Sequence, residues 1–427
     1  MQVLCVREYG HIAPIIGGVP RQESNAVRVT VEDFRLLKQM LLAGRECDDD
    51  TPYLFKLATY AGVEALQVQQ YAGVILLPSG NCIEVLPKIF VADEAQSLTR
   101  SRAVLLKMLR ALPDSPFRLF EKAALACGEM PLLEVFIACF LHEVGELIRR
   151  GICSDYQQEE GNRTFLRGKL LLREQIRHNA ARRDRFYVQY DEFVPDRPEN
   201  RLIKAALCRI AKISRDGENI RRCRIHLDAF GAIPPSTNIA SDFAACRRDR
   251  NIAHYIPSLA WCRLLLQGQS PIPQAGQHQC LSVLFPMEVL FEKYVTRKLG
   301  EKATLAGWKM TAQARSEHLV ELHDGSAHFM LKPDMLFSKP GARCAADTKW
   351  KIIRSRDDIK QSDLYQMFAY AEKYLRSEQH KRTFLIYPQT EQTPVSLAPF
   401  YFRKEGSELR VVPYDLDRDE CSLTELI

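Results

Sequence analysis

Three side chains in the last third of the sequence have the types and spacing that cleavage of a phosphodiester requires. Asp347 and Lys349 are separated by one residue, and Asp334 follows a proline in the segment before them. Two carboxylates can hold a hard Mg²⁺ ion while leaving coordination places for phosphate oxygen and water. A bound metal lowers the pKa of its water, and a nearby lysine helps to position or deprotonate that nucleophile. These residues therefore predict metal-dependent cleavage of DNA.

Two neighbouring strands must bring these groups together. Along a strand over Ala345–Ile352, alternation places Asp347 and Lys349 on one face, about 6.6 Å apart. We expect the preceding strand to cover His328–Phe337, so that pairing across a turn-prone connector brings Asp334 beside Asp347. The proline before Asp334 removes one ladder donor, which fits an edge or a bend where the pair opens.

A helix expected over Asp363–Leu375 contributes a second set of side chains. Gln366 and Tyr370 lie at i and i+4, so they share a face and can point toward the site together. The buried stripe of this helix is expected to contain Leu364, Met367, Phe368 and Ala371. Because a D-x-K pattern is common by chance and an aromatic at this spacing is usually packing, the ordered set of motifs carries the prediction.

A fifth candidate lies on the helix expected over Met287–Leu299. Glu292 occurs there among residues patterned for burial. Two interpretations stay open: Glu292 completes the metal site, or it is an exposed helix carboxylate. Glu288, one turn earlier, is the rival candidate for the same role.

The chain has 427 residues, which predicts two or three domains. Residues 1–95 are expected to form a β-rich domain that contacts a partner, with one helix capped by Thr30. Residues 96–280 are expected to be mainly helical and to end in a linker at Gln267–Gln279. Residues 281–427 are expected to form an α/β domain with a mixed central sheet, so the fold class is multidomain α+β and α/β.

Composition excludes several other classes of protein. Hydrophobic residues make up 46% and charged residues 26% of the chain, as in ordinary globular proteins. No stretch approaches the roughly 18 apolar residues of a membrane helix, and the N-terminus has the pattern of a strand rather than a signal peptide. The 13 cysteines contain no CxxC pair, which favours a reducing, cytoplasmic location.

Basic residues cluster in the middle of the chain, although the net charge of +6 is modest for this length. Such a cluster suits a polyanion whose counterions are released on binding. A solvated helix face explains it equally well, and contact with DNA or with protein also stays open. The cluster consists of Arg163, Arg167, Lys169, Arg173, Arg177, Arg182, Arg183 and Arg185.

The order P-D, D-x-K and Q-x-x-x-Y resembles the PD-(D/E)xK nuclease superfamily. More closely, the chain looks like the McrC family, the endonuclease subunits of McrBC-type modification-dependent restriction systems. One departure, Asp347 in place of a glutamate, preserves the ligand type. The resemblance covers most of the chain in short blocks, the C-terminal ones being the more specific: Ile83–Ile89, Leu166–Leu170, Asp196–Arg201, Phe291–Glu292, Lys332–Asp334, Asp347–Lys349 and Asp363–Gln366.

The resemblance implies a type IV restriction endonuclease that needs Mg²⁺, with Mn²⁺ as a substitute. Asp334 and Asp347, completed by Glu292, would hold the metal, Lys349 would assist the water, and Gln366 would orient the site. The implied partner is a hexamer of an McrB-like AAA+ GTPase, which this chain would stimulate, and the substrate is double-stranded, methylated DNA. The sequence contains no GxxxxGK[ST] motif, so GTP would be bound by the partner.

Two other functions compete with this interpretation. The chain would be a non-catalytic adaptor that activates an AAA+ ring, or a stand-alone DNA repair nuclease of the same superfamily. All three of Asp334, Asp347 and Lys349 are present, which argues against a degenerate site. The resemblance leaves open whether two copies dimerise through the nuclease domain.

Overall fold

The structure is a computed structural model that describes residues 2–15, 18–23, 25–44, 54–89, 94–112, 117, 130–247, 250–267, 281–392, 397–403 and 406–421. Its backbone contacts divide the chain into two compact units, Met1–Leu132 with Ser270–Ile427, and Leu133–Gln269. Except for its first residue, the predicted linker Gln267–Gln279 lies outside the described residues.

The N-terminal part of the first unit contains two small sheets. One has the order β3-β4-β2-β6-β5 and the other the order β1-β8-β7-β12. Hydrophobic side chains from both sheets and from helix α1 share one core. The strands are β1 (Val3–Arg7), β2 (His11–Ile15), β3 (Arg21–Glu23), β4 (Ala26–Thr30), β5 (Phe55–Tyr60), β6 (Val63–Val68), β7 (Tyr71–Leu76), β8 (Cys82–Leu86) and β12 (Leu281–Pro286).

Two local features of the N-terminal region are a capped helix and a pair of adjacent strands. The Thr30 hydroxyl accepts a hydrogen bond from the Asp33 amide at 3.1 Å, which caps helix α1 (Val31–Gly44). Strands β7 and β8 pair antiparallel across the turn after Leu76, as expected of a hairpin. The cap predicted at Thr30 is confirmed.

Strand β12 joins the first sheet although it lies far away in the sequence. It pairs antiparallel with β7, and this close approach needs a glycine at position 73. A Cβ atom at Gly73 would lie 2.0 Å from the Val283 carbonyl oxygen, and the backbone has a φ of +144°. The segment expected to begin the C-terminal domain at Leu281 thus starts with a strand of the N-terminal sheet, and the domain limits themselves stay predictions.

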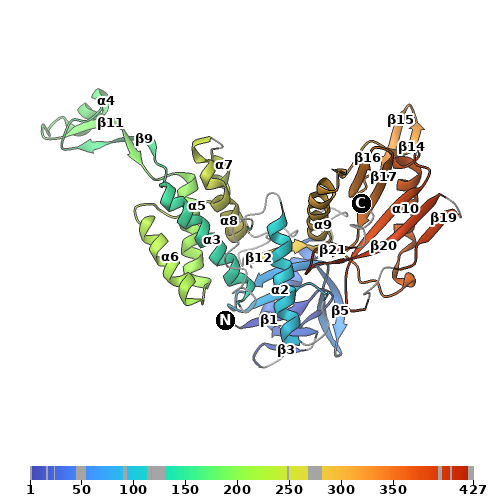
Figure 1. Cartoon of the computed structure of the whole chain (residues 1–427). Helices are drawn as coiled ribbons and strands as arrows, with labels where there is room; N and C mark the ends of the chain where they lie inside the picture. Colours follow the sequence, from blue (N-terminus) through green and yellow to red (C-terminus); the bar gives the residue numbers. More distant parts are fainter. Residues whose placement is uncertain are drawn as a thin grey trace. The chain divides into compact units, whose positions relative to one another are not determined.

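The candidate site lies on a seven-stranded mixed sheet, which confirms the predicted fold class of the C-terminal region (Figure 1). Strands β16 and β17 pair antiparallel, whereas β17, β18 and β20 run parallel. The path along the sheet is β13-β16-β17-β18-β20-β19, with β21 on β20. Its strands are β13 (Lys309–Ala312), β16 (Met335–Lys339), β17 (Ala342–Thr348), β18 (Lys381–Pro388), β19 (Phe400–Arg403), β20 (Ser407–Asp415) and β21 (Glu420–Cys421).

Two helices pack against opposite faces of this sheet. Helix α10 (Gln361–Tyr374) shares a core with Ala345 of β17 and Val411 of β20. Helix α9 (Met287–Leu305) packs on the other face, since its Phe291 contacts the rings of Trp350 and Tyr414. Side chains alternate between the two faces along a strand, and these two residues are an odd number of positions from Ala345 and Val411. The two faces of β17 therefore have different neighbours. Helix α2 (Glu94–Ala111) and the short helix η3 (Arg356–Asp358) belong to the same unit.

One predicted strand is wrong, and the strand predicted over Ala345–Ile352 is shifted, because β17 ends at Thr348. The segment His328–Phe337 is not continuous, because β15 (Ser326–Met330) ends before Pro333 and β16 begins after it. A proline has no N–H for the ladder and disfavours helix at the residue before it, so Leu331–Asp334 connects the two strands. Strand β15 pairs instead with β14 (His318–His323) in a separate two-stranded ribbon.

The predicted buried stripe of α10 is partly wrong. Met367 and Ala371 are buried as expected, but the Phe368 side chain is 39% exposed. Tyr370 and Tyr374 occupy the buried face instead, because their hydroxyl groups find backbone acceptors there.

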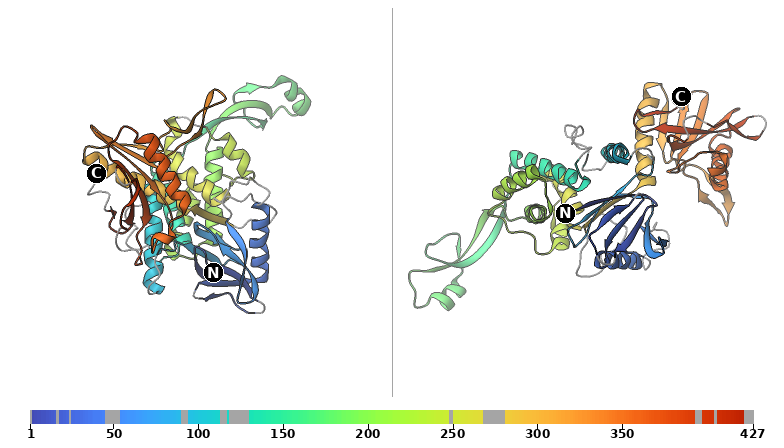
Figure 2. Two further views of the ribbon diagram at one scale, coloured as in Figure 1. Left: turned by 90° about the vertical axis from the view of Figure 1, so that its right-hand side faces the viewer. Right: turned by 90° about the horizontal axis from the view of Figure 1, so that it is seen from below.

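The second unit combines helices with a long ribbon. Strands β9 (Asp155–Arg163) and β11 (Phe186–Val194) pair antiparallel, and Figures 1 and 2 show their ribbon projecting from the helices of this unit. Its other elements are α3 (Leu132–Arg150), β10 (Lys169–Leu170), α4 (Leu172–Asn179), α5 (Pro198–Ile213), α6 (Gly217–Ala229), α7 (Ile239–Ala245), η2 (Arg250–Tyr255) and α8 (Ile256–Gln267).

The basic cluster lies at the end of this ribbon. Arg163 pairs with Phe186, so the residues between them form the ribbon's tip together with the short helix α4. The cluster is therefore not one solvated helix face, which corrects that interpretation. No helix in the described part of the chain is long and apolar enough to cross a membrane.

Candidate active site

Asp347 lies near the end of β17, on the face that helix α10 covers. Its side chain is 1% exposed, and its Oδ1 accepts a hydrogen bond from Nε2 of Gln366 at 3.4 Å. The ammonium of Lys349 lies 2.5 Å from Oδ2. The structure therefore brings together the aspartate, lysine and glutamine that the sequence predicted to share a site.

Asp334 is held at the start of β16 by the neighbouring strand. The pairing of Met335 with Ala346 places Asp334 opposite the end of β17. Its Oδ2 accepts two hydrogen bonds from Thr348, one from the amide at 2.7 Å and one from the hydroxyl at 2.6 Å. Because Thr348 directly follows Asp347, this double contact fixes the two carboxylates beside each other, as predicted from strand pairing.

Burial and mutual repulsion shift the proton affinity of these groups. Burial, together with the nearby Asp334 carboxylate, raises the pKa of Asp347 to about 7. Burial also raises the pKa of Asp334, although its bonds from Thr348 act in the opposite direction. For Lys349, burial lowers the pKa, but the adjacent Asp347 carboxylate outweighs it and the pKa rises overall. The site thus holds its carboxylates in a state that favours an added positive charge.

Two tyrosines on α10 hold the segment that carries Asp334. The Tyr370 hydroxyl donates to the Lys332 carbonyl oxygen at 2.8 Å and accepts from Nε2 of Gln366 at 2.7 Å. One turn later, the Tyr374 hydroxyl lies 2.8 Å from the Leu331 carbonyl oxygen. Pro333 interrupts the ladder in this segment, so these side chains supply contacts that a continuous strand would have made through its backbone.

Glu292 lies on α9 next to the site without joining its hydrogen bonds. The carboxylate is partly buried and accepts a hydrogen bond from Nε2 of Gln313 at 2.8 Å. Burial raises its pKa, and the Asp334 carboxylate adds to the shift. The backbone N–H of Gln313 donates to the Asp334 carbonyl oxygen at 3.0 Å. Its rival Glu288 is exposed, and the role of Glu292 as a metal ligand stays a prediction.

The donor set fits a hard divalent cation that keeps part of its water shell. Oδ2 of Asp347 is buried and makes no hydrogen bond with good geometry, its neighbour being the Lys349 ammonium. Among the described residues, no three histidine, cysteine, aspartate or glutamate side chains gather closely enough to enclose a metal ion. Two carboxylates with open positions match the coordination that Mg²⁺ prefers.

Several site residues were missed in the sequence. Thr348 lies between Asp347 and Lys349, which alternation places on one face, yet its hydroxyl reaches Asp334 because that residue lies off the end of the neighbouring strand. Gln313 lies in the connection between β13 and β14 and has a φ of +44°. No local sequence pattern predicts its contact with the site. The Lys351 ammonium lies 2.8 Å from the buried Asp363 carboxylate and ties the chain after β17 to α10. The i, i+4 spacing of Tyr370 and Tyr374 was the one available signal.

Two of the family-like blocks outside the site supply polar contacts within the fold. Glu84 is fully buried, binds Arg102 at 2.8 Å and accepts the Leu132 amide. In the second unit, Arg201 bridges Asp196 and Asp242 at the start of α5.

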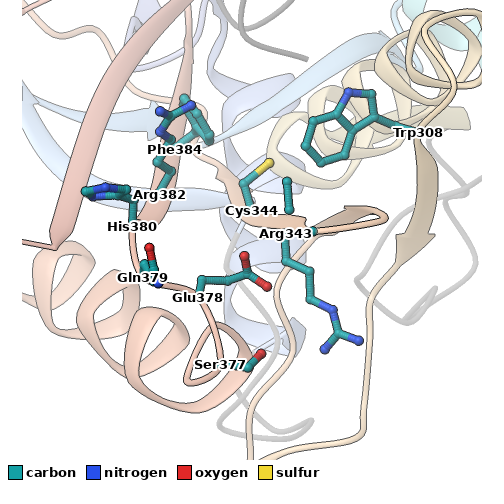
Figure 3. Close-up of a pocket in the computed structure, with 11 residues that line it drawn as sticks. Trp308, Arg343, Cys344, Ser377, Glu378, Gln379, His380, Arg382 and Phe384 are labelled. Carbon is teal, nitrogen blue, oxygen red and sulfur yellow. The ribbon is translucent and has the colours of Figure 1, made fainter.

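A cleft of about 390 Å³ lies at the other end of the same strands. It is lined by Trp308, Arg343, Cys344, His380, Arg382 and Phe384, among others. Figure 3 shows the guanidinium groups of Arg343 and Arg382 pointing apart, so they do not converge on one ligand. The cleft opens where β17 begins, whereas Asp347 lies where it ends, and it is separate from the candidate site.

The sequence matches the family model described as "McrBC 5-methylcytosine restriction system component" over residues 66–388. The chain belongs to the McrBC family. This confirms the resemblance predicted from the short sequence blocks. No curated protein sequence matches the chain.

Solved structures show the same fold in this family. One similar chain comes from a tetradecameric assembly of Thermococcus gammatolerans McrB AAA+ hexamers with bound McrC, with a TM-score of 0.69, 18% identity and 100% coverage of both chains. Another comes from the cryo-EM structure of the Thermococcus gammatolerans McrBC complex, with a TM-score of 0.50 and 18% identity over 70% of this chain and 88% of that chain. At this identity the likeness establishes the fold.

We expect Thr348→Val to destabilise the protein by about 1.5–3 kcal/mol, because it removes a hydrogen bond to a buried carboxylate at nearly constant volume. Thr348→Ser, which keeps the hydroxyl, is the matched control and should lose less. Urea unfolding measures both variants. Equal stability of the valine variant and the wild type would contradict the contact with Asp334.

We expect Tyr370→Phe to loosen the connector before β16 and to cost about 1 kcal/mol, because it removes the bond to the Lys332 carbonyl. Amide hydrogen exchange should accelerate over residues 331–334. Tyr365→Phe on the same helix is the control, since the Tyr365 side chain is 65% exposed. Similar exchange in the two variants would show that Tyr370 only packs.

Proposed function

We propose that this chain is the Mg²⁺-dependent DNA endonuclease subunit of a GTP-driven, modification-dependent restriction complex. The observation that carries the proposal is the convergence of Asp334, Asp347 and Lys349 at the end of β17. Two buried carboxylates with raised pKa values beside a lysine are costly to maintain, which points to a functional site rather than to a stabilising ion pair.

Each residue has a distinct role in this proposal. Asp334 and Asp347 would hold the cation, which when bound withdraws charge from the phosphate and lowers the pKa of its water. Lys349 positions the nucleophile and offsets negative charge on the phosphate through its ammonium. Gln366 orients Asp347 through the bond to Oδ1, and its own amide is held by Tyr370. Glu292 would add a third carboxylate beside Gln313.

The proposed partner is a hexameric McrB-like AAA+ GTPase. Support comes from membership of the McrBC family and from the fold shared with chains of McrB–McrC assemblies. The absence of a GxxxxGK[ST] motif from this sequence means that GTP would bind the partner. We propose that this chain stimulates the partner's GTPase and that the complex cuts double-stranded, methylated DNA. Mn²⁺ would substitute for Mg²⁺.

We expect Asp347→Ala to abolish DNA cleavage by the complex, with a loss of orders of magnitude in rate, because it removes a proposed cation ligand. Binding of the partner and stimulation of its GTPase should stay at the wild-type level. The control is Asp324→Ala in the same domain, whose carboxylate is 88% exposed. Plasmid cleavage with purified partner, GTP and Mg²⁺ measures the effect.

Two results would overturn the nuclease assignment. Cleavage by Asp347→Ala at the wild-type rate would remove Asp347 from the site. Intact DNA with wild-type protein, alongside a stimulated GTPase, would favour the non-catalytic adaptor. Cleavage without any GTPase partner would instead favour the stand-alone repair nuclease.

Binding of the cation should depend on pH through Asp347. The ionised carboxylate is the form that binds metal, and a pKa of about 7 leaves it largely protonated in more acidic solution. Affinity for Mg²⁺ or Mn²⁺ should therefore rise, by up to about tenfold per pH unit, as the pH increases to about 7, and then level off. Calorimetric titration of the chain measures this, with Asp347→Asn as the control. An affinity that is flat between about pH 6 and pH 8 contradicts the assignment.

A further inference from the structure

The residue after Lys349 is tied to the N-terminal part of the chain. Trp350 is fully buried, and its indole N–H donates to both carboxylate oxygens of Glu8, at 3.0 and 2.9 Å. Glu8 directly follows strand β1 and is 3% exposed. A contact between residues 342 positions apart in the sequence therefore fixes the chain next to the candidate catalytic lysine.

Lys88 completes this contact from the end of the neighbouring strand. Its ammonium donates to the Trp350 carbonyl oxygen at 3.1 Å, and its amide donates to Oε2 of Glu8 at 3.1 Å. The same ammonium lies over the Tyr9 ring, 4.7 Å from its centre. Because β1 and β8 pair in parallel, Glu8 and Lys88 lie at the same end of the sheet, just after the two strands. Together they hold both the side chain and the backbone of Trp350.

Trp350 also packs against helix α9, and the residue before it is hydrogen-bonded to β18. The Phe291 ring of α9 lies 5.2 Å from the indole ring, centre to centre. The Lys349 amide donates to the Ile386 carbonyl oxygen of β18 at 2.9 Å. The chain at Lys349 and Trp350 is thus held by β18 on one side and by the N-terminal sheet on the other.

This arrangement places charged groups in a poorly solvated position. Burial raises the pKa of Glu8 to about 7 and lowers the pKa of Lys88, and each group partly offsets the other. The remaining charged groups that act on the pair are Glu288 and Lys351. Burying charged groups yields little net stability, whereas it specifies geometry when their hydrogen bonds are satisfied.

We propose that Glu8 and Lys88 are positioning residues for DNA cleavage, acting through Trp350 to hold Lys349 in place beside Asp347. This inference rests on the proposed nuclease function and deepens it. Misplacement of a catalytic group by about 1 Å costs on the order of a hundredfold in rate. The N-terminal sheet would then be part of the machinery that keeps the site in its active geometry.

Three variants of the full-length chain test this role. Trp350→Phe removes the indole N–H while keeping a ring next to Phe291, Glu8→Met removes its acceptor, and Lys88→Met removes the ammonium while keeping the side-chain stem. The matched control is Glu84→Gln, which alters another buried carboxylate of the same sheet that binds Arg102 instead. Lys38→Met, which breaks the partly exposed pair with Glu64, is a milder control that leaves the core intact.

Two measurements separate positioning from general stability. We expect kcat for plasmid cleavage by the complex to fall about tenfold to a hundredfold in the three variants, with KM for DNA unchanged. Amide hydrogen exchange over residues 347–351 should be about tenfold faster in the variants than in both controls, at matched thermal stability. The double variant Glu8→Met, Trp350→Phe should be no worse than the more affected single variant, because both changes remove one bond.

The outcomes are distinct from those of the proposed function. Unchanged exchange and unchanged kcat in Trp350→Phe and Glu8→Met would overturn the inference, and so would equal effects in the controls. Faster exchange at 347–351 with unchanged kcat would also overturn it. If wild-type protein did not cut DNA, the proposed nuclease function would fail, and the positioning inference that rests on it would fail with it.

Discussion

The candidate site depends on the pairing of β16 with β17. This register places Asp334 beside the end of β17, where the amide and the hydroxyl of Thr348 both donate to one oxygen of its carboxylate. Asp347 precedes Thr348, so the same contact sets two carboxylates next to each other in a region where burial raises the pKa of both. Repulsion between them is relieved by Lys349 and, under the proposed function, by a divalent cation.

The elements around this strand pair restrain it from different directions. Helix α10 reaches Asp347 through Gln366 and the connector before Asp334 through Tyr370. On the opposite face, Phe291 and Glu8 contact Trp350. Side chains add to the ladder hydrogen bonds here because Pro333 interrupts one strand and β17 ends at Thr348. Such a site has a geometry that side chains from several elements define.

The short sequence blocks that resemble the McrC family can be located in the structure. Some of these blocks supply residues of the candidate site, and others supply polar contacts such as Glu84 with Arg102. The block Leu166–Leu170 lies instead at the exposed end of the ribbon. Lys88 belongs to one of these N-terminal blocks and touches Trp350 next to the site. A residue in an apparently structural block can therefore bear on the site, because strands far apart in sequence end at the same place.

The sequence by itself determined the types of group, their local spacing and the class of fold. Alternation along β17, the cap at Thr30 and the spacing on α10 are local properties, and each led to the observed element. Tertiary structure alone decided that Thr348 binds Asp334, that β12 completes an N-terminal sheet and that Glu8 holds Trp350. These contacts join residues of different elements, which no helical or strand periodicity relates. Only the folded chain therefore brings them within hydrogen-bonding distance.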